Sequence, residues 1–308
     1  MNDSLYYRHS GKAPALPLVL ALLFIPFSAM LFAWCYVWCV WHIPFVFLNF
    51  ILTLLFGLFA CLPVFFAVKK GNVRNKGLVM ALSLLACALM IYAEWAAWCA
   101  LVTQHSFRLG IDRTSLEGRA GFSWYLMHPQ AMIALAYIVA DTGLWTLGST
   151  VVSGIPLVMV WLAEAGLTIC IGVFAMVDLL KFPFSESWQK WLEEERSTIL
   201  LKPLSIPPAE LRSRIEQGDL GIFSNAERAA PGDKFRYELA VYKTPDLNEI
   251  YFTLFEVKVE NKGGKERKAN KALIKQLALS KSQFEKLAEM GYFYSPSTSE
   301  AAMASRPA

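Results

Sequence analysis

Residues 15–41 read ALPLVLALLFIPFSAMLFAWCYVWCVW and contain no Lys, Arg, Asp or Glu. A helix needs roughly 20 apolar residues to cross the ~30 Å hydrocarbon layer of a bilayer, and this stretch exceeds that length. Further apolar stretches without Lys or Arg are equally long, and they occupy 43–68, 78–103 and 151–180. The sequence therefore predicts four transmembrane spans.

Charge divides the chain into two unlike parts. Hydrophobic residues make up 56% of the chain, yet only 10 of its 29 Lys and Arg precede Phe182. The charged content from Phe182 onward is ordinary for a water-soluble domain. We expect a membrane all-α part, a four-helix transmembrane bundle, followed by a small cytosolic α+β domain. The predicted boundaries are a cytosolic N-terminal segment at 1–14, a transmembrane domain at 15–181, the α+β domain at 182–293 and a disordered tail at 294–308.

Basic residues indicate which side of the membrane each end occupies. Arg8 and Lys12 precede the first span, and four basic residues lie in 69–76, whereas the connection at 41–44 has none. By the positive-inside rule the N-terminus is cytoplasmic, and an even number of spans returns the C-terminus to the same side. The first span is too long for a signal-peptide core and is expected to stay as an anchor. These features predict a multi-pass protein of a cell membrane, and they fit a bacterial inner membrane.

Residues 124–147 are apolar enough to be weighed as a fifth span. Pro129 suits a helix start, but the apolar part that follows it measures only about 25 Å at the α-helical rise. Gln130, Tyr137 and Asp141 draw a polar line along one side, as expected of a helix that lies in the membrane interface. We expect an interfacial or re-entrant helix. A fifth span is the alternative, and it would place the C-terminal domain outside.

The C-terminal part combines a predicted β-hairpin with predicted helices. Apolar and polar residues alternate in 235–243 and 250–260, on either side of a turn, which predicts the hairpin. A helical region follows Gly264 and runs to about Gly291, with a capping box at Ser280 and Gln283 that can divide it in two. Because an isolated hairpin is only marginally stable, we expect this region to cover one face of it.

Two further helices are predicted before the hairpin. Ser185 or Ser187 can cap a helix that runs to about Leu201. Pro207-Pro208 opens a short helix, and Gly218 suits its left-handed C-terminal cap.

The residues Pro245-Asp246 and Glu256-Val257-Lys258 resemble the nuclease signature of the PD-(D/E)xK superfamily. In that family two acids hold a divalent cation and the lysine positions or activates the attacking water. The resemblance would imply a membrane-tethered nuclease that uses Asp246, Glu256 and Lys258. Here, however, one continuous strand would join the two acids and part them by roughly 30 Å. We therefore expect no catalytic residues, and we favour a protein that is not an enzyme.

Two acids, Glu94 and Glu164, lie inside the predicted spans, about 14 Å and about 20 Å from the outer ends. An ionisable group at that depth is costly and indicates a functional site by default. The pair could share a proton or cation, as in a channel or transporter. Alternatively, both are neutral and bonded within the bundle, for example to Asn49, Thr53 or a backbone carbonyl. No Lys or Arg inside a span completes a relay, so transport is the secondary hypothesis.

Soft metal ligands lie near the outer end of the first and third spans. They are Cys35, Cys39, His42, Cys99 and His105, and thiolate with imidazole suits copper(I) or zinc. Tryptophans form a parallel stripe on the first span, and cysteine is a common small filler in helix packing. We expect no metal site and no cofactor.

A basic stretch follows the predicted hairpin. Residues 258–289 carry 9 Lys and Arg against 4 Asp and Glu. Such a surface suits an acidic protein, an anionic leaflet or nucleic acid, but no nucleic-acid-binding fingerprint accompanies it. A solvated face is the simpler interpretation. The residues of this candidate patch are Lys262, Lys265, Arg267, Lys268, Lys271 and Lys275.

The predicted cytosolic domain lacks the usual catalytic parts. It has no phosphate-binding glycine loop, no cysteine and no histidine. We therefore expect a non-catalytic membrane protein that presents a cytosolic binding domain within an assembly. The expected partners are membrane lipid and other membrane or cytosolic proteins, and nucleic acid is the least favoured. Small-residue spacings such as Ala93-xxx-Ala97 and Ala96-xxx-Ala100 would allow close packing within the bundle or between copies.

Overall fold

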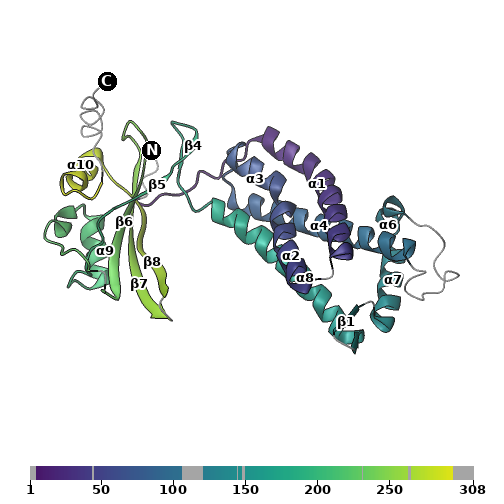
Figure 1. Cartoon of the computed structure of the whole chain (residues 1–308). Helices are drawn as coiled ribbons and strands as arrows, with labels where there is room; N and C mark the ends of the chain where they lie inside the picture. Colours follow the sequence, from purple (N-terminus) through teal and green to yellow (C-terminus); the bar gives the residue numbers. More distant parts are fainter. Residues whose placement is uncertain are drawn as a thin grey trace, which may run out of the picture. The chain divides into compact units, whose positions relative to one another are not determined.

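The computed structural model describes residues 5–43, 45–105, 121–143, 145–147, 150–230, 232–262 and 265–293. They form two compact units (Figure 1). Residues 10–181 make up a helical unit, and residues 5–9 join 182–293 in an α+β domain. The predicted disordered tail at 294–308 lies outside the described residues.

The helical unit contains the long apolar helices that the sequence predicts. Three of them are long and apolar enough to cross a membrane: α1 (Ala15–His42), α4 (Lys76–Gln104) and α8 (Gly154–Leu179). A fourth apolar segment consists of α2 (Val46–Ala60) and α3 (Leu62–Lys69), which are bent by 45° where they meet. Pro63 at the start of α3 suits this break, because it cannot donate a backbone hydrogen bond to α2. Three to four long apolar helices are thus confirmed.

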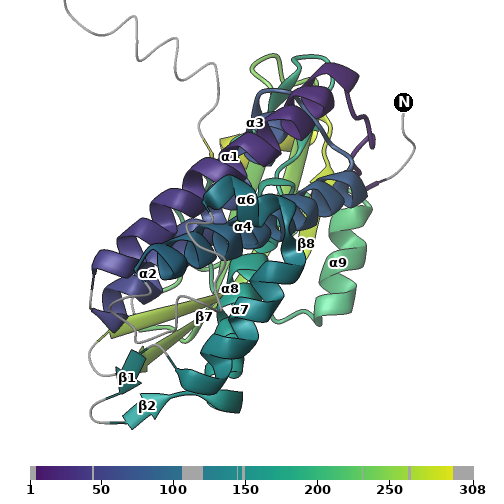
Figure 2. The same ribbon diagram turned by 90° about the vertical axis from the view of Figure 1, so that its right-hand side faces the viewer.

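Helix α4 is the centre of the helical unit. Its N-terminus is capped by Asn75, whose Oδ1 accepts the backbone N–H of Leu78 at 3.0 Å. It packs along α1 and against α8, and Figure 2 shows α1 and α4 side by side. The predicted small-residue faces are buried within the helical unit, since Ala93, Ala96, Ala97 and Ala100 are all buried. They therefore close-pack within the bundle, as small residues do between membrane helices.

Two shorter helices pack on one end of the bundle through aromatic side chains. They are α6 (Phe122–Met127) and α7 (Pro129–Thr142), followed by the strands β1 (Trp145–Leu147) and β2 (Thr150–Val152). Tyr92 on α4 donates to the Leu126 carbonyl oxygen at 2.6 Å, and Thr103 lies 2.6 Å from the Tyr125 hydroxyl. With 14 residues, α7 measures about 21 Å and is too short to cross a bilayer alone. This length weighs against a fifth span.

The α+β domain is built on an antiparallel sheet in the order β5-β6-β7-β8. The predicted hairpin is confirmed as β6 (Phe235–Lys243) and β7 (Ile250–Lys262), paired from Phe235 opposite Lys258 to Lys243 opposite Ile250. One face of the sheet packs on α9 (Pro208–Glu216), the 3₁₀ helix η1 (Leu220–Phe223) and α10 (Lys281–Glu289). Among the side chains buried there are Leu239, Phe252, Leu254, Phe223 and Phe284.

The predicted helix that begins after Gly264 is wrong over its first half. Residues Lys265–Ala278 form the strand β8, which pairs along the whole of β7. The composition of this stretch, rich in Lys, Ala, Leu and Gln, favours a helix locally, but pairing with the open edge of β7 overrides that preference. The second half is confirmed, because Ser280 and Gln283 form the predicted capping box at the start of α10. The predicted hairpin covered by one helix is therefore a four-stranded sheet covered by several helical segments.

The predicted helix from Ser185 to about Leu201 is also wrong. This segment forms β3 (Phe184–Ser185), β4 (Lys190–Trp191) and the short edge strand β5 (Glu194–Arg196). The Ser185 hydroxyl accepts the backbone N–H of Trp188 at 3.1 Å and closes a turn. Gln189, at φ 51°, then reverses the chain. By contrast, the short helix after Pro207-Pro208 is confirmed as α9, with Gly218 at φ 86° behind it.

The N-terminal segment is part of the α+β domain. The backbone N–H of Tyr7 donates to the Gln276 carbonyl at 2.9 Å, and that of Ala278 donates to the Leu5 carbonyl at 2.9 Å. These bonds extend the sheet beyond the edge of β8. The Tyr6 hydroxyl donates to Glu216 of α9, and the Tyr7 ring packs edge-on to Tyr251. The predicted separate segment at 1–14 is thus divided between the two units.

Candidate functional site

One polar side chain from each of four helices meets inside the helical unit. The Tyr36 hydroxyl on α1 donates to Glu164 on α8 and lies 2.9 Å from Thr53 Oγ1 on α2. Glu94 on α4 is close enough to interact electrostatically with Glu164 and with Tyr36. We call Tyr36, Thr53, Glu94 and Glu164 the polar cluster. The structure thus brings together the two acids that the sequence singled out.

Neighbouring groups hold Tyr36 and Thr53 in place. The Tyr36 ring stacks on Phe56, with the ring centroids 4.2 Å apart and the planes inclined by 19°. Thr53 Oγ1 is 3.0 Å from the Asn49 carbonyl oxygen, one turn away. Asn49 Nδ2 donates to the Ile43 carbonyl at 3.3 Å, while the buried Asn49 Oδ1 has no hydrogen-bond partner among the described residues. Tyr36 and Thr53 are therefore held in place by their neighbours. The Asn49 Oδ1 beside them is an acceptor without a partner among the described residues.

Helices α2 and α8 pack backbone to backbone beside the cluster. A Cβ on Gly172 would lie 2.7 Å from Cys87 Sγ and 2.9 Å from the Gly57 carbonyl oxygen. A Cβ on Gly57 would lie 2.9 Å from the Thr168 carbonyl oxygen. Contacts this close are possible only without side chains, and they are typical of helix packing in membranes. We call the facing residues the α2–α8 ladder: Thr53, Gly57 and Cys61 on α2 and its end, and Glu164, Thr168 and Gly172 on α8.

Polar groups on and beside the α2–α8 ladder continue along the bundle beyond the polar cluster. Thr168 is fully buried, and its Oγ1 has no hydrogen-bond partner among the described residues. The Cys87 thiol lies 3.9 Å from the Thr168 carbonyl oxygen and 3.7 Å from the Cys61 sulfur. The Cys61 thiol lies 3.8 Å from the Ser83 carbonyl oxygen. A line of polar atoms thus continues from Glu164 toward the N-terminus of α4.

Sequence reasoning missed most of this arrangement. The signal was present, because Thr53, Gly57 and Cys61 recur every four residues, as do Glu164, Thr168 and Gly172. That spacing places each set on one helix face. Which two faces meet is decided by packing and cannot be read from spacing alone.

The nuclease residues are not assembled. Asp246 lies in the turn after β6, whereas Glu256 and Lys258 lie within β7, which runs unbroken from Ile250. The six residues from Ile250 to Glu256 alone span about 20 Å. Hydrogen bonds from Thr244, Trp188 and Asn248 lower the pKa of Asp246 to about 2, and Lys258 pairs with Glu260 at 2.7 Å. Asp246 and Lys258 are engaged locally, and the strand separates Asp246 from Glu256, so the geometry does not support metal-dependent cleavage.

The soft ligands at the end of the first span do not form a metal centre either. Cys35 is exposed, Cys99 is fully buried, and His42 Nδ1 donates to the Trp38 carbonyl oxygen of its own helix at 2.8 Å. His105 Nδ1 bonds the Leu101 carbonyl oxygen at 2.9 Å in the same way. In the described part of the chain, no three His, Cys, Asp or Glu side chains could hold a metal ion together.

The basic stretch lies on the β7–β8 hairpin. Pairing with β6 ends at Lys258, while the β7–β8 pair continues to Lys262 opposite Lys265, so only two strands remain at this end. Lys268, Lys271 and Lys275 are exposed on β8. For Lys262, Lys265 and Arg267 only the strand positions are described, and Gly263-Gly264 lie outside the described residues. Lys262, Lys265, Arg267 and Lys268 thus lie on the two-stranded end, whereas Lys271 and Lys275 lie on β8 where β6 also pairs with β7. We call this basic part of β7 and β8 the basic hairpin.

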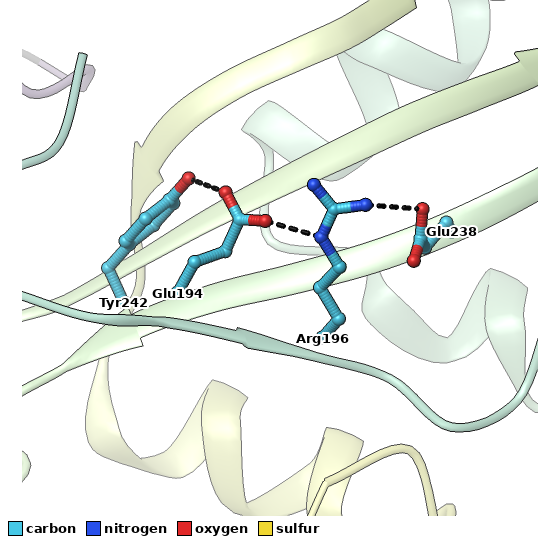
Figure 3. Close-up of polar contacts among 4 residues, drawn as sticks. All are labelled: Glu194, Arg196, Glu238 and Tyr242. Carbon is cyan, nitrogen blue, oxygen red and sulfur yellow. Dashed lines mark hydrogen bonds and ion pairs between the residues drawn. The ribbon is translucent and has the colours of Figure 1, made fainter. Parts of the chain in front are cut away.

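Charges near the short strand β5 pair with one another (Figure 3). Arg196 bonds Glu194 and also donates from Nη1 to Glu238 at 3.0 Å, and its guanidinium lies 5.3 Å from the Phe255 ring centroid. The Tyr242 hydroxyl donates to Glu194, and burial is the main cause that raises the pKa of Tyr242. This network fixes β5 on β6. Its groups satisfy each other, so we assign it a structural role.

Comparison of the chain with protein-family profiles, with curated proteins and with solved structures finds no match. Function is therefore inferred from the chain's own residues.

Proposed function

We propose that the chain is a non-catalytic membrane protein whose four apolar segments cross the bilayer. Both of its ends would join in one cytosolic α+β domain, which binds other proteins of a membrane assembly. The observation that carries this proposal is the pairing of residues 5–7 with the edge of β8.

This pairing supports an even number of crossings. A chain that leaves the α+β domain after His9 and re-enters it at Phe182 must start and end its helical unit on the same side. Three spans would separate Tyr6 from its partners Leu277 and Glu216, whereas four spans keep them together. This pairing does not involve the basic loops, yet it favours the same topology as the positive-inside rule.

The surface of the helical unit supports insertion in lipid. Large apolar side chains point outward on every long helix, with Leu16 70% exposed, Phe47 90% and Ile155 79%. Monomeric proteins in water rarely expose so many large apolar side chains together, so this surface supports the proposal. The inner membrane of a bacterium is the compartment we propose, with both ends in the cytoplasm.

The basic hairpin is the docking element we propose for an acidic protein surface. Its described lysines are exposed, and beyond Lys258 it stands clear of β6. Strong single-sign charge attracts and orients oppositely charged partners.

A topology experiment tests the first part of the proposal. Reporter fusions after residue 43 and after residue 293 should report opposite sides, with green fluorescent protein fluorescent only at 293 and alkaline phosphatase active only at 43. A fusion at 293 that is active outside the cell would contradict the proposal. Cleavage of residues 182–293 by a protease added to intact cells would contradict it as well.

Co-purification tests the second part. Membranes solubilised gently should yield partner proteins with the unmodified chain, and Lys268→Glu with Lys271→Glu should reduce their recovery about tenfold. The matched control reverses Lys281 and Lys286, which are exposed on α10 of the same domain and give the same change in net charge. Equal loss in both variants would reject the basic hairpin as the docking element. Partners that disappear on nuclease treatment would indicate nucleic acid instead.

A further inference from the structure

We propose that the polar cluster is a proton-binding site. One proton is held by Glu94 and Glu164 together and exchanges with water along the polar atoms of the bundle. This site lies in the helical unit and goes beyond the docking function of the α+β domain.

The charge balance of the bundle favours a neutral form for at least one carboxyl group. Glu94 and Glu164 interact with each other, and the four apolar stretches contain no Lys or Arg that could pair with them. An unpaired buried charge is very costly, and a negative charge on one carboxylate disfavours ionisation of the other. The pair therefore binds a proton, and its total charge is one negative while that proton is bound.

The hydrogen bonds decide where the proton and the charge reside. Glu164 accepts from the Tyr36 hydroxyl and is also bonded by Thr53. Among the described residues, Glu94 has no hydrogen-bond donor. Since hydrogen bonds to a carboxylate favour its ionised form, the negative charge resides on Glu164 and the proton on Glu94. A site with this asymmetry can bind and release a single proton.

Two acceptor oxygens flank the cluster and provide an independent observation. Thr168 follows Glu164 by one turn on α8, is fully buried, and has an Oγ1 without a partner in the described part of the chain. Asn49 precedes Thr53 by one turn on α2, and its buried Oδ1 is likewise without a partner there. Buried polar atoms left unbonded are rare and destabilising. Both oxygens can accept a hydrogen bond from a proton donor beside the cluster, and Thr168 lies on the α2–α8 ladder.

The same geometry favours a proton over a metal ion. A proton needs only one acceptor at a time, whereas a metal ion needs several ligands around a common centre. No group of three His, Cys, Asp or Glu side chains within the described ranges could form such a centre. Beyond Thr168 the polar atoms of Cys87, Cys61 and Ser83 continue the line toward the basic loop at 69–76.

Infrared difference spectroscopy on the full-length protein in liposomes tests the proposal. Stepping the pH between about 5 and about 9 should produce a reversible carboxyl C=O band, which shifts when H₂O is replaced by D₂O. The band should be lost in Glu94→Gln. In Glu164→Gln the band should move to lower pH, because loss of the neighbouring negative charge makes Glu94 easier to ionise.

A matched control and a folding check make the result decisive. Thr103→Val removes a buried hydroxyl of α4 that lies outside the α2–α8 ladder, and it should leave the band unchanged. Each variant should elute as the unmodified protein does in size exclusion. A wild-type protein without a pH-dependent band, a band that survives Glu94→Gln, or a band that Glu164→Gln leaves at the same pH would overturn the proposal. A carboxyl signal that follows sodium concentration instead of pH would overturn it too.

Discussion

The helical unit and the α+β domain place the same side chains in opposite ways. In the α+β domain Phe252 and Phe284 are fully buried, while lysines line the outside. In the helical unit Phe47 is 90% exposed, while Ser83 and Thr168 are fully buried. Apolar burial stabilises a fold only when the alternative is contact with water. The contrast is the one expected if the helical unit lies in lipid, as we propose, and the α+β domain lies in water.

The difference also changes what holds each unit together. The α+β domain depends on apolar volume, because its core lies between the sheet and its helices. The helical unit depends on close approach at Gly57 and Gly172 and on bonds such as that from Tyr36 to Glu164. Substitutions of the same kind should therefore change stability by different amounts in the two units. Four pairs of measurements test what holds each unit together.

The largest effect is expected from truncating a phenylalanine in the domain core. Phe252→Ala should lower the free energy of unfolding by about 3–5 kcal/mol, because it removes a fully buried ring and leaves a cavity. Phe47→Ala, on the exposed face of α2, should change it by less than about 0.5 kcal/mol. Urea unfolding of the full chain in detergent micelles measures both. Equal losses would mean that the Phe47 face is packed against protein.

The next effect concerns the close contact between α2 and α8. Gly172→Ala should destabilise the helical unit by about 1–3 kcal/mol, since its Cβ would overlap two sulfur atoms and a carbonyl oxygen. Gly166→Ala on the same helix meets nothing within 4 Å and should stabilise it by about 0.5–1 kcal/mol. Titration with sodium dodecyl sulfate in mixed micelles measures the difference. Stability changes of opposite sign for Gly172→Ala and Gly166→Ala would support a close contact between α2 and α8. Changes of the same sign would contradict it.

A smaller effect is expected at the capping box of α10. Ser280→Ala removes the side chain that accepts from the Gln283 backbone N–H, and should cost about 1 kcal/mol. Ser213→Ala on α9 removes an exposed hydroxyl outside any cap and serves as the control. The shift in urea midpoint should appear for the first variant alone. A similar shift for both would assign the effect to loss of a hydroxyl group in general.

The smallest effect is the contribution of Asp246 to acid stability. Its pKa of about 2 lies below the ordinary value of 3.8, first because of the Thr244 hydrogen bond. A lowered pKa in the folded state stabilises the fold above about pH 4, and this contribution is lost as the pH falls toward about 2. Asp246→Asn should reduce the change in urea midpoint between these two pH values. Asn248→Ala should reduce it in part. An unchanged slope would show that the turn is not linked to titration of Asp246.

Sequence patterns predicted the helical unit well because one strong signal dominates there. Long runs without Lys or Arg have few alternatives to a helix in an apolar setting, and α1, α4 and α8 begin and end within a few residues of the predicted stretches. The bend at Cys61 was not predicted, although Pro63 was visible in the sequence. Whether a proline interrupts a helix depends on the neighbours that donate hydrogen bonds to the freed carbonyl oxygens.

The α+β domain was predicted only where local and long-range preferences agree. Alternation in 235–243 and 250–260 suits strands, and they are strands. The residues of β8 prefer a helix, and only the edge of β7, brought close by the fold, makes them a strand. The same holds for β5, which exists because β6 offers it an edge. Pairing partners of this kind leave no signal within a short window of sequence.

The residues of the candidate site were likewise predicted only in part. Glu94 and Glu164 were predicted because a carboxyl group at such depth is unusual by itself. Tyr36 and Thr168 were not predicted as part of the site, because hydroxyl groups are common in apolar helices, and the four-residue spacing of Glu164 and Thr168 does not show which helix they face. Their importance comes from the helix faces that meet, which only the packed bundle decides.

The pairing of residues 5–7 with β8 has a consequence for biogenesis. Tyr6 is synthesised before its partner Glu216, which follows 210 residues later, and before Leu277, which follows later still. Residues 5–7 therefore stay unpaired until β8 has been synthesised. If four segments cross the bilayer as we propose, a chain with one crossing too few would leave residues 5–7 on the opposite side from these partners. Closure of this sheet edge would then depend on correct insertion of the helical unit.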